Sequence, residues 1–574
     1  MKKIQINLNK QRKGYYFLYT LSAAFILLLV FSSCKKQLDV QNPNAPTIAG
    51  NVNDEAGITA FAKGGVYWNG FNYGDGWLGD SYFSLPWGYH ELMGDVAGGG
   101  QGSNNQTTTM GVPDKFIADP ANPSTTTFTN PSPQASGIIR SFNNSASTAN
   151  GNNALYYEWV NMYSMINACN ATIENLGTIT LSADKANTVK AWCYWWKGYA
   201  YAQIGTLYYA GLIVNKSNEL VSTFVKQADI IAESNKNLNL ALTTLTGISN
   251  QGDYSSIIAQ LIPGQCQVGL GTALTSAQWI RTVNTMLARN IVLNHLAPYV
   301  NGNPAATIAK ASIPAMSAAD WQSVITLCNN GVKQGDKVFT GRTAGTNSFF
   351  SPIGGSVAGI MTASNQSTTY KLSERLVQQF KTGDSRRANF STANGTFFGD
   401  ANTNTTRYSL VDGVTAGLTG IPILGSRQVG GLEIYIGPTY EENQLMLAEA
   451  DIRTGAIPAA LTLIDNIRAY QGSGVAAIAG SPLTTAQALK ELTMERMAAL
   501  AFRGLSFYDM RRWGWTYSIA NGGGRYGNTL IFNTIVYPNA TIDYNFMDYW
   551  DVPADETEKN APASGSAPVK NVNY

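Results

Sequence analysis

Regular helical periodicity between residues 440 and 513 constrains the fold of this chain more than any other feature of the sequence. Apolar Leu445, Ala448 and Ile452 recur at the spacing of one helix face, and Gly455 breaks the pattern. Two similar stretches follow, one ending at a pair of glycines and one starting at a Thr-x-x-Gln capping box. Short helices joined by short loops pack as antiparallel hairpins, so the sequence predicts an all-α core.

Charged residues interrupt the apolar faces of these predicted helices. Four of them stand where the periodicity calls for a buried side chain: Glu449, Arg468, Glu495 and Arg496. A buried carboxylate or guanidinium is costly unless it is paired and hydrogen-bonded, so we predict an ion-pair network that ties neighbouring hairpins together. A catalytic role for the same residues is the alternative, because active sites also perturb charged groups.

Five strings in the second half of the chain carry a family resemblance. They are SERLVQQFKTGDSRR, AEA, IDNIRA, MERMAALAFRGLSFYDMRRWG and WDVPADE. Together they resemble the SusD/RagB family of nutrient-binding lipoproteins of Bacteroidetes outer membranes, although the last string lacks its usual first proline. The resemblance implies an all-α, SusD-like fold of degenerate tetratricopeptide-type helical hairpins. It further implies a single domain over residues 54–574, with loop-rich insertions at about 96–153 and 340–440.

Residues 1–33 have the composition of a secretory signal peptide. Basic residues from Lys2 to Lys13 precede an apolar run from Tyr15 to Phe31. A signal anchor that stays in the membrane is the alternative interpretation of that run. We prefer a lipoprotein signal, because Phe31-Ser32-Ser33-Cys34 resembles a lipobox in which the cysteine Cys34 is acylated. Residues 34–53 then form a lipidated tether on the outer membrane.

Charge and cysteine usage exclude several classes of function. The chain has 39 Lys and Arg residues, five of which precede Cys34, and 37 Asp and Glu residues, all of which follow it. The mature chain is therefore slightly acidic, so we expect no nucleic-acid partner. Two histidines and five cysteines show no metal-ligand spacing, and we expect neither a metal nor a cofactor. The sequence leaves open whether a disulfide forms among Cys169, Cys193, Cys266 and Cys328.

A glycine-rich aromatic segment separates two predicted helices within residues 54–93. A loop cannot bury that many rings by itself, so the rings either form a satellite core or remain exposed. Flat ring faces suit the apolar faces of sugars, and an acidic turn follows the segment. We predict five ligand-binding residues, each with packing between loops as its alternative role: Trp68, Tyr73, Trp77, Trp87 and Asp95.

The resemblance implies a cell-surface lipoprotein that binds oligosaccharides or other oligomeric nutrients, so we expect no enzyme activity and no catalytic residue. It also implies a SusC-like TonB-dependent transporter as the partner, with the protein on the extracellular side of the outer membrane. The stretch from Val96 to Gly100 lacks the aromatic ring that family members often place there, so the resemblance does not by itself carry over a starch-binding site. Whether the ligand is a glycan or a peptide stays open.

The sequence is also compatible with two alternative functions. A glycan-degrading enzyme of the same locus would need two carboxyl groups facing each other across a cleft. The acids that the sequence places, Glu449, Glu495 and Asp509, lie in predicted helices instead. The second alternative is an adaptor of the transporter complex, whose helical repeats bind only protein.

Overall fold

The computed structural model describes most of the chain after residue 51, and residues 54–574 form one compact unit. The predicted signal peptide, Cys34 and the tether up to residue 51 lie outside the described residues. Within the described part, no helix is both long and apolar enough to span a membrane. The described residues are 52–67, 85–99, 109–130, 136–144, 153–295, 315–342, 370–392, 406–410, 433–532 and 534–574.

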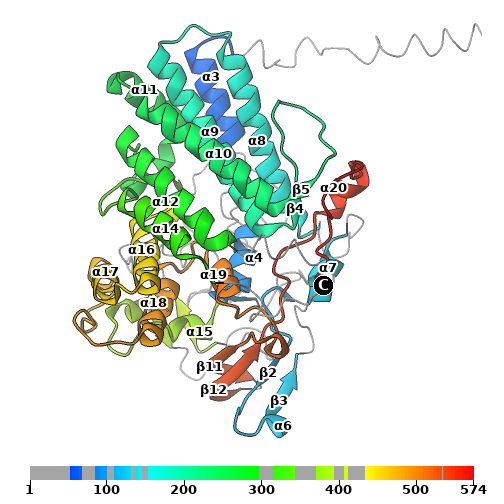
Figure 1. The fold of residues 1–574 in the computed structure, drawn as a ribbon, viewed down its shortest axis with the longest axis vertical. Coiled ribbons are helices and arrows are strands. Elements are labelled where there is room, and N and C mark those ends of the chain that lie inside the picture. The colour runs from blue at the N-terminus through cyan, green and yellow to red at the C-terminus, as the bar shows by residue number, and fades with distance from the viewer. Residues whose placement is uncertain are drawn as a thin grey trace, which may run out of the picture. The chain divides into compact units, whose positions relative to one another are not determined.

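Helix α9 is the centre of the first group of helices (Figure 1). Ser182 begins it by accepting a hydrogen bond from the Lys185 N–H, and the helix packs against α8 and α10. Its Trp192, Trp195 and Trp196 are fully buried, with ring centroids 5.4 to 5.8 Å from that of Phe339. The group consists of α3 (Glu55–Ala62), α8 (Tyr156–Leu176), α9 (Ala183–Leu207), α10 (Gln227–Thr246) and α11 (Gln251–Leu261).

A second group of helices contains the hairpins predicted between residues 440 and 513. Gly455 ends α16 in the left-handed conformation, with φ of 93°, and Thr484 with Gln487 forms the predicted capping box of α18. The group consists of α12 (Ser276–Asn294), α14 (Ala318–Asn329), α16 (Tyr440–Thr454), α17 (Ile457–Tyr470), α18 (Thr485–Ala499) and α19 (Ser506–Arg512). The prediction of an all-α, hairpin-built fold is confirmed.

A four-stranded antiparallel sheet is the main feature that the sequence did not predict. Its strand order is β11-β12-β2-β3, and it joins the end of the chain to the insertion at 96–153 (Figure 1). The rings of Phe116, Phe128 and Phe532 pack together at centroid distances of 5.0 to 5.1 Å and give this sheet an apolar face. The strands are β2 (Lys115–Ile117), β3 (Thr127–Thr129), β11 (Arg525–Phe532) and β12 (Ile535–Asp543).

Several short elements lie outside the two helix groups and the four-stranded sheet. The helices are α4 (Leu85–Met93), α6 (Pro123–Thr126), α7 (Ser136–Phe142), α15 (Glu374–Val377) and α20 (Ala554–Lys559). The described part also contains four antiparallel strand pairs: β1 (Ala97–Gly99) with β7 (Tyr370–Leu372), β4 (Ala210–Gly211) with β5 (Val225–Lys226), β6 (Thr340–Arg342) with β10 (Glu433–Tyr435), and β8 (Phe390–Thr392) with β9 (Tyr408–Leu410).

The predicted ion-pair network lies between the last hairpins. The Glu495 carboxylate accepts hydrogen bonds from Arg386 at 2.6 Å and from Arg468 at 2.9 Å. Arg386 is also held by Asp384, two residues earlier in the chain, at 2.7 Å. All four side chains are buried. The network therefore ties α17 and α18 to the turn after α15, as the charged residues in the apolar faces predicted.

Removal of the Glu495 carboxylate should destabilise the fold strongly. Glu495→Ala leaves the buried Arg386 and Arg468 without a shared partner, and breaking a buried pair in this way costs about 3–5 kcal/mol. The free energy of unfolding from urea titration measures this loss. Lys236→Ala is the control, because the Lys236 side chain is 60% exposed in its pair with Glu233 and should cost less than about 1 kcal/mol. Equal losses in the two variants would contradict a supporting role for the network.

Candidate ligand-binding site

The structure describes two of the five predicted ligand-binding residues. Trp68, Tyr73 and Trp77 lie outside the described residues. Trp87 lies on α4 and Asp95 follows the end of the same helix, and both side chains are buried. The role of all five in ligand binding stays a prediction.

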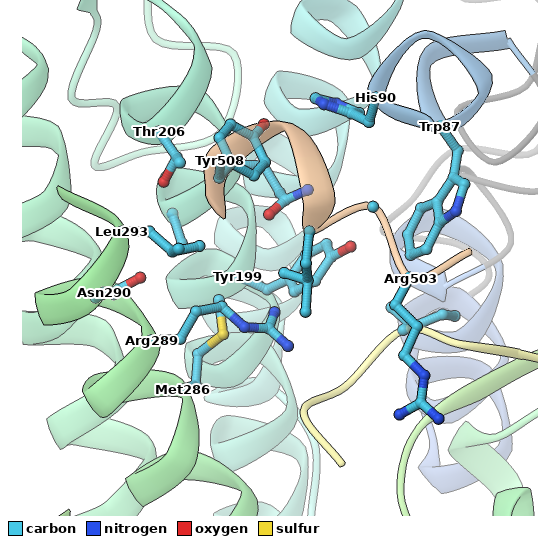
Figure 2. A pocket seen from close by; sticks show the side chains of 15 residues that line it. Trp87, His90, Tyr199, Thr206, Met286, Arg289, Asn290, Leu293, Arg503 and Tyr508 are labelled. Carbon is cyan, nitrogen blue, oxygen red and sulfur yellow. The ribbon is translucent and has the colours of Figure 1, made fainter. Parts of the chain in front are cut away.

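Trp87 lines an internal cavity between α4, α9, α12 and α19 (Figure 2). The cavity volume is about 20 Å³, which is room for about one water molecule. Two polar side chains at its wall have carboxylate partners: His90 Nε2 lies 2.7 Å from Glu158, and Arg289 lies 2.6 Å from Glu442. In this conformation the cavity is too small for a sugar ring.

Glu91, next to this cavity on α4, has an unusual environment. The Gly504 N–H donates a hydrogen bond of 2.6 Å to its carboxyl group, which is fully buried. Burial penalises the charged form and raises the pKa of Glu91 to about 8. The folded protein therefore holds a proton on Glu91 at neutral pH.

Asp95 is the centre of a buried cluster that joins distant parts of the chain. Arg375 donates two hydrogen bonds to its carboxylate at 2.5 and 2.7 Å, and Arg525 donates one at 2.8 Å. Ser373 and Tyr544 add two hydroxyl donors at 2.8 and 2.7 Å. With five bonds from protein groups, the Asp95 carboxylate has its acceptor sites filled and positions the arginines.

Two surface hollows, larger than the internal cavity, meet at Trp515 and Thr493. Their volumes, about 560 and 430 Å³, lie in the range of small-molecule sites. The sheet hollow is lined by Gln378, Gln379, Ala486, Leu489, Lys490, Thr493, Met494, Trp515, Arg525, Tyr526, Gly527 and Asn528. The helix hollow is lined by His295, Ala315, Met316, Trp321, Glu449, Arg453, Thr493, Arg512, Trp513, Gly514 and Trp515.

The end of α19 fixes the two tryptophans between the hollows. Gly514 has φ of 80°, and its N–H bonds to the Arg511 carbonyl while the Trp515 N–H bonds to the Met510 carbonyl at 2.9 Å. This is a Schellman motif, which places Trp515 directly after the helix. The rings of Trp513 and Trp515 then contact each other at a centroid distance of 5.0 Å.

An arginine lies behind each of these rings. The guanidinium carbon of Arg525 lies 4.8 Å from the Trp515 centroid, and that of Arg512 lies 5.1 Å from the Trp513 centroid. Arg525 is held in turn by Asp95, as described above. The predicted residue Asp95 therefore reaches the sheet hollow indirectly, through Arg525 and Trp515.

The sheet hollow also has a fixed wall on the β11 side. The Gln378 amide accepts from the Thr529 N–H at 2.9 Å and donates to the Thr529 carbonyl at 3.3 Å, so it pairs with the strand edge. Tyr526, on the same strand, is 64% exposed. The sheet hollow therefore combines a wall that hydrogen bonds hold in place with the exposed ring of Tyr526.

Sequence reasoning missed Trp513, Trp515 and Tyr526 as candidate site residues. The signal was the string Trp-Gly-Trp after the predicted last helix, because a glycine at that position is typical of a helix end that turns the next residue outward. Chemically, half-buried rings next to amides and a lysine can hold a flat ligand with an apolar face and a polar edge. No group of three or more His, Cys, Asp or Glu residues within the described ranges could hold a metal ion.

Helical hairpins with an attached four-stranded sheet define the fold of this protein, and comparison with known proteins shows which proteins it is similar to. Residues 440–573 match the model of the SusD family, which confirms the predicted resemblance to SusD/RagB proteins. The matched segment contains α16 to α20, Trp513 and Trp515. No curated protein sequence matches the chain.

Solved structures of similar fold extend the comparison beyond that segment. A SusD-like carbohydrate binding protein from Bacteroides vulgatus ATCC 8482 matches with a TM-score of 0.50 and 12% identity, covering 90% of this chain and 98% of that one. A SusD homolog from Bacteroides thetaiotaomicron VPI-5482 matches with a TM-score of 0.50 and 14% identity, covering 81% of this chain and 88% of that one. At such low identities these similarities establish the fold.

The raised pKa of Glu91 predicts a specific pH dependence of stability. The ordinary glutamate pKa is 4.5 and the folded value is about 8, so the folded state binds more protons between these values. The stability that Glu91 contributes is complete below pH 4.5 and falls as the pH rises toward 8, by at most about 1.4 kcal/mol per pH unit. Glu91→Gln mimics the protonated form and should lack this component.

Urea unfolding of the wild-type protein and of Glu91→Gln at pH 5, 6.5 and 8 measures the effect. The free energy of unfolding of the wild type should fall relative to that of the variant as the pH rises. A difference that stays constant across the three pH values would show that Glu91 is ionised in the folded protein.

Proposed function

We propose that this protein binds an oligosaccharide in the cleft formed by the two hollows and delivers it to a SusC-like TonB-dependent transporter. The observation that carries the proposal is the position of Trp515, whose ring is shared by both hollows. A ring at that position can stack on the apolar face of a sugar while the chain extends to both sides. The carbohydrate-binding protein of similar fold from Bacteroides vulgatus supports the choice of a glycan over a peptide.

The proposed site binds without catalysis. Glu449 is the carboxylate among the described residues of the helix hollow, and Arg512 holds it with two bonds of 2.7 Å. Although its burial opposes ionisation, Arg512 lowers the pKa of Glu449 to about 2. Glycoside hydrolysis uses a pair of carboxyl groups, one of them protonated as the general acid, and an ionised, arginine-bound Glu449 does not suit that role.

The five ligand-binding residues predicted from the sequence have two different roles in this proposal. Trp68, Tyr73 and Trp77 are proposed as further stacking rings for the ligand. Trp87 and Asp95 are proposed to act from behind the surface, because both are buried and Asp95 positions Arg525 beneath Trp515. Acylation of Cys34 would tether the protein to the outer membrane on its extracellular side.

Replacement of Trp515 tests the site directly. Trp515→Ala should weaken binding of the recognised oligosaccharide by about tenfold or more, because tryptophans at the centre of a site often contribute about 2 kcal/mol. Titration calorimetry against a panel of oligosaccharides and peptides measures the affinity. Since the ring is only half-buried, the melting temperature should change by a few degrees at most.

Tyr194→Ala is the matched control, because Tyr194 is a half-buried ring of α9 that lines neither hollow. It should leave the affinity unchanged. Unchanged affinity in Trp515→Ala would move the site away from the cleft, and binding of peptides alone would overturn the glycan proposal. If new reducing ends appear while the protein is incubated with an oligosaccharide, the protein is a glycan-degrading enzyme.

Replacement of Cys34 tests the proposed anchor. A Cys34→Ala chain should lose its acyl groups and leave the washed membrane fraction, because the lipid provides the membrane affinity. Mass spectrometry of the mature N-terminus and fractionation of cells measure this. A variant that stays in the membrane would instead support an uncleaved signal anchor at Tyr15 to Phe31.

A further inference from the structure

The two hollows share an excess of positive charge. Lys490 and Arg525 line the sheet hollow, and none of the described residues that line it is Asp or Glu. Arg453 and Arg512 line the helix hollow, and Glu449 is the one acid among the described residues that line it. The mature chain is slightly acidic overall, whereas the described residues that line the two hollows carry a net positive charge.

The carboxylates beside the sheet hollow do not neutralise all of its positive charge. Asp95 is shared by Arg375 and Arg525, with shortest bonds of 2.5 and 2.8 Å. Glu374, next in the cluster, is bound by Arg407 at 2.6 Å. Three guanidinium groups therefore face two carboxylates, which leaves one positive charge beside the hollow.

The ion pairs beside the helix hollow also contain more guanidinium groups than carboxylates. Arg512 bonds to Glu449 and to Asp509 at 2.7 Å, and Arg496 bonds to Asp509 at 3.0 Å. Arg453 reaches Glu449 only at 3.7 Å and its side chain is 40% exposed. Again three guanidinium groups face two carboxylates, and Arg453 is the one whose charge is available to a ligand.

Lys490 supplies the corresponding group on the other side of Trp515. It is exposed on α18, and no ion pair joins it to another described residue. The neighbouring Glu491 is taken by Lys381 and Arg468. An exposed lysine and a weakly paired arginine on opposite sides of a stacking ring suit anionic groups on successive units of a polymer.

We propose that the cleft selects acidic oligosaccharides, with Lys490 and Arg453 as the residues that contact their carboxylate or sulfate groups. This inference rests on the proposed glycan-binding function and specifies the class of ligand. Trp515 provides stacking that any sugar can use, whereas Lys490 and Arg453 distinguish charged sugars from neutral ones.

Paired ligands test this selectivity with the purified full-length protein in detergent. The probes are oligogalacturonate and alginate oligosaccharides with their carboxyl-reduced, neutral counterparts of the same length, and chondroitin sulfate oligosaccharides with counterparts that are both desulfated and carboxyl-reduced. At 50 mM salt the wild type should bind at least one acidic probe about tenfold more tightly than its neutral counterpart, and 300 mM salt should reduce the ratio. The double variant Lys490→Gln/Arg453→Gln should bind the acidic probe and its neutral counterpart with equal affinity.

Lys216→Gln/Lys559→Gln is the control, because it removes two exposed charges far from the residues of either hollow and should keep the ratio. Equal binding of acidic and neutral probes, with dependence on Trp515, would overturn the inference and leave the proposed function standing. A charge preference that survives in Lys490→Gln/Arg453→Gln would overturn the assignment of these residues. Failure of the wild type to bind any glycan would overturn both.

Discussion

The sharing of the Asp95 carboxylate by two buried arginines is the interaction on which the arrangement of the chain depends most. Asp95 follows α4, Arg375 lies on α15 and Arg525 begins β11, so three segments that are each at least 150 residues apart in the sequence meet at one carboxylate. The close approach of α4 to α19 brings Asp95 there: a Cβ on Gly94 would come within 2.7 Å of Ser506. The sheet and the short insertion elements are thereby attached to the helical hairpins.

Buried ion pairs of this kind give little net stability, because removing two charges from water costs about as much as their attraction returns. Their effect here is geometric. A bidentate guanidinium–carboxylate contact accepts a narrow range of orientations, so Asp95 determines where Arg525 lies and Arg525 determines what lies beneath Trp515. An apolar cluster of the same volume could hold the segments together without fixing the ring.

The sequence predicted the helical hairpins because their periodicity is local, and the capping box at Thr484 and the break at Gly455 formed as expected. It also predicted the burial of Glu495 and Arg468. The sheet could not be predicted, since β2 and β3 have three residues each and β2 pairs with β12, a strand more than 400 residues away. The cleft was missed for a similar reason: Gln378, Lys490 and Trp515 come together only through tertiary packing, whereas the aromatic run near residue 70 is conspicuous in the sequence itself.

The position of the cleft follows from the meeting of two charge networks. One network, around Asp95, ends in Arg525 beneath Trp515, and the other, around Glu449 and Asp509, ends in Arg512 beneath Trp513. Gly514 separates the two rings and lets the chain turn, so each ring lies against the arginine of its own network. Since the same ion pairs hold the hairpins and the sheet in place, the fold and the stacking surface have a common physical origin. The excess of arginine over carboxylate in both networks adds to the charge that the exposed Lys490 brings to the cleft.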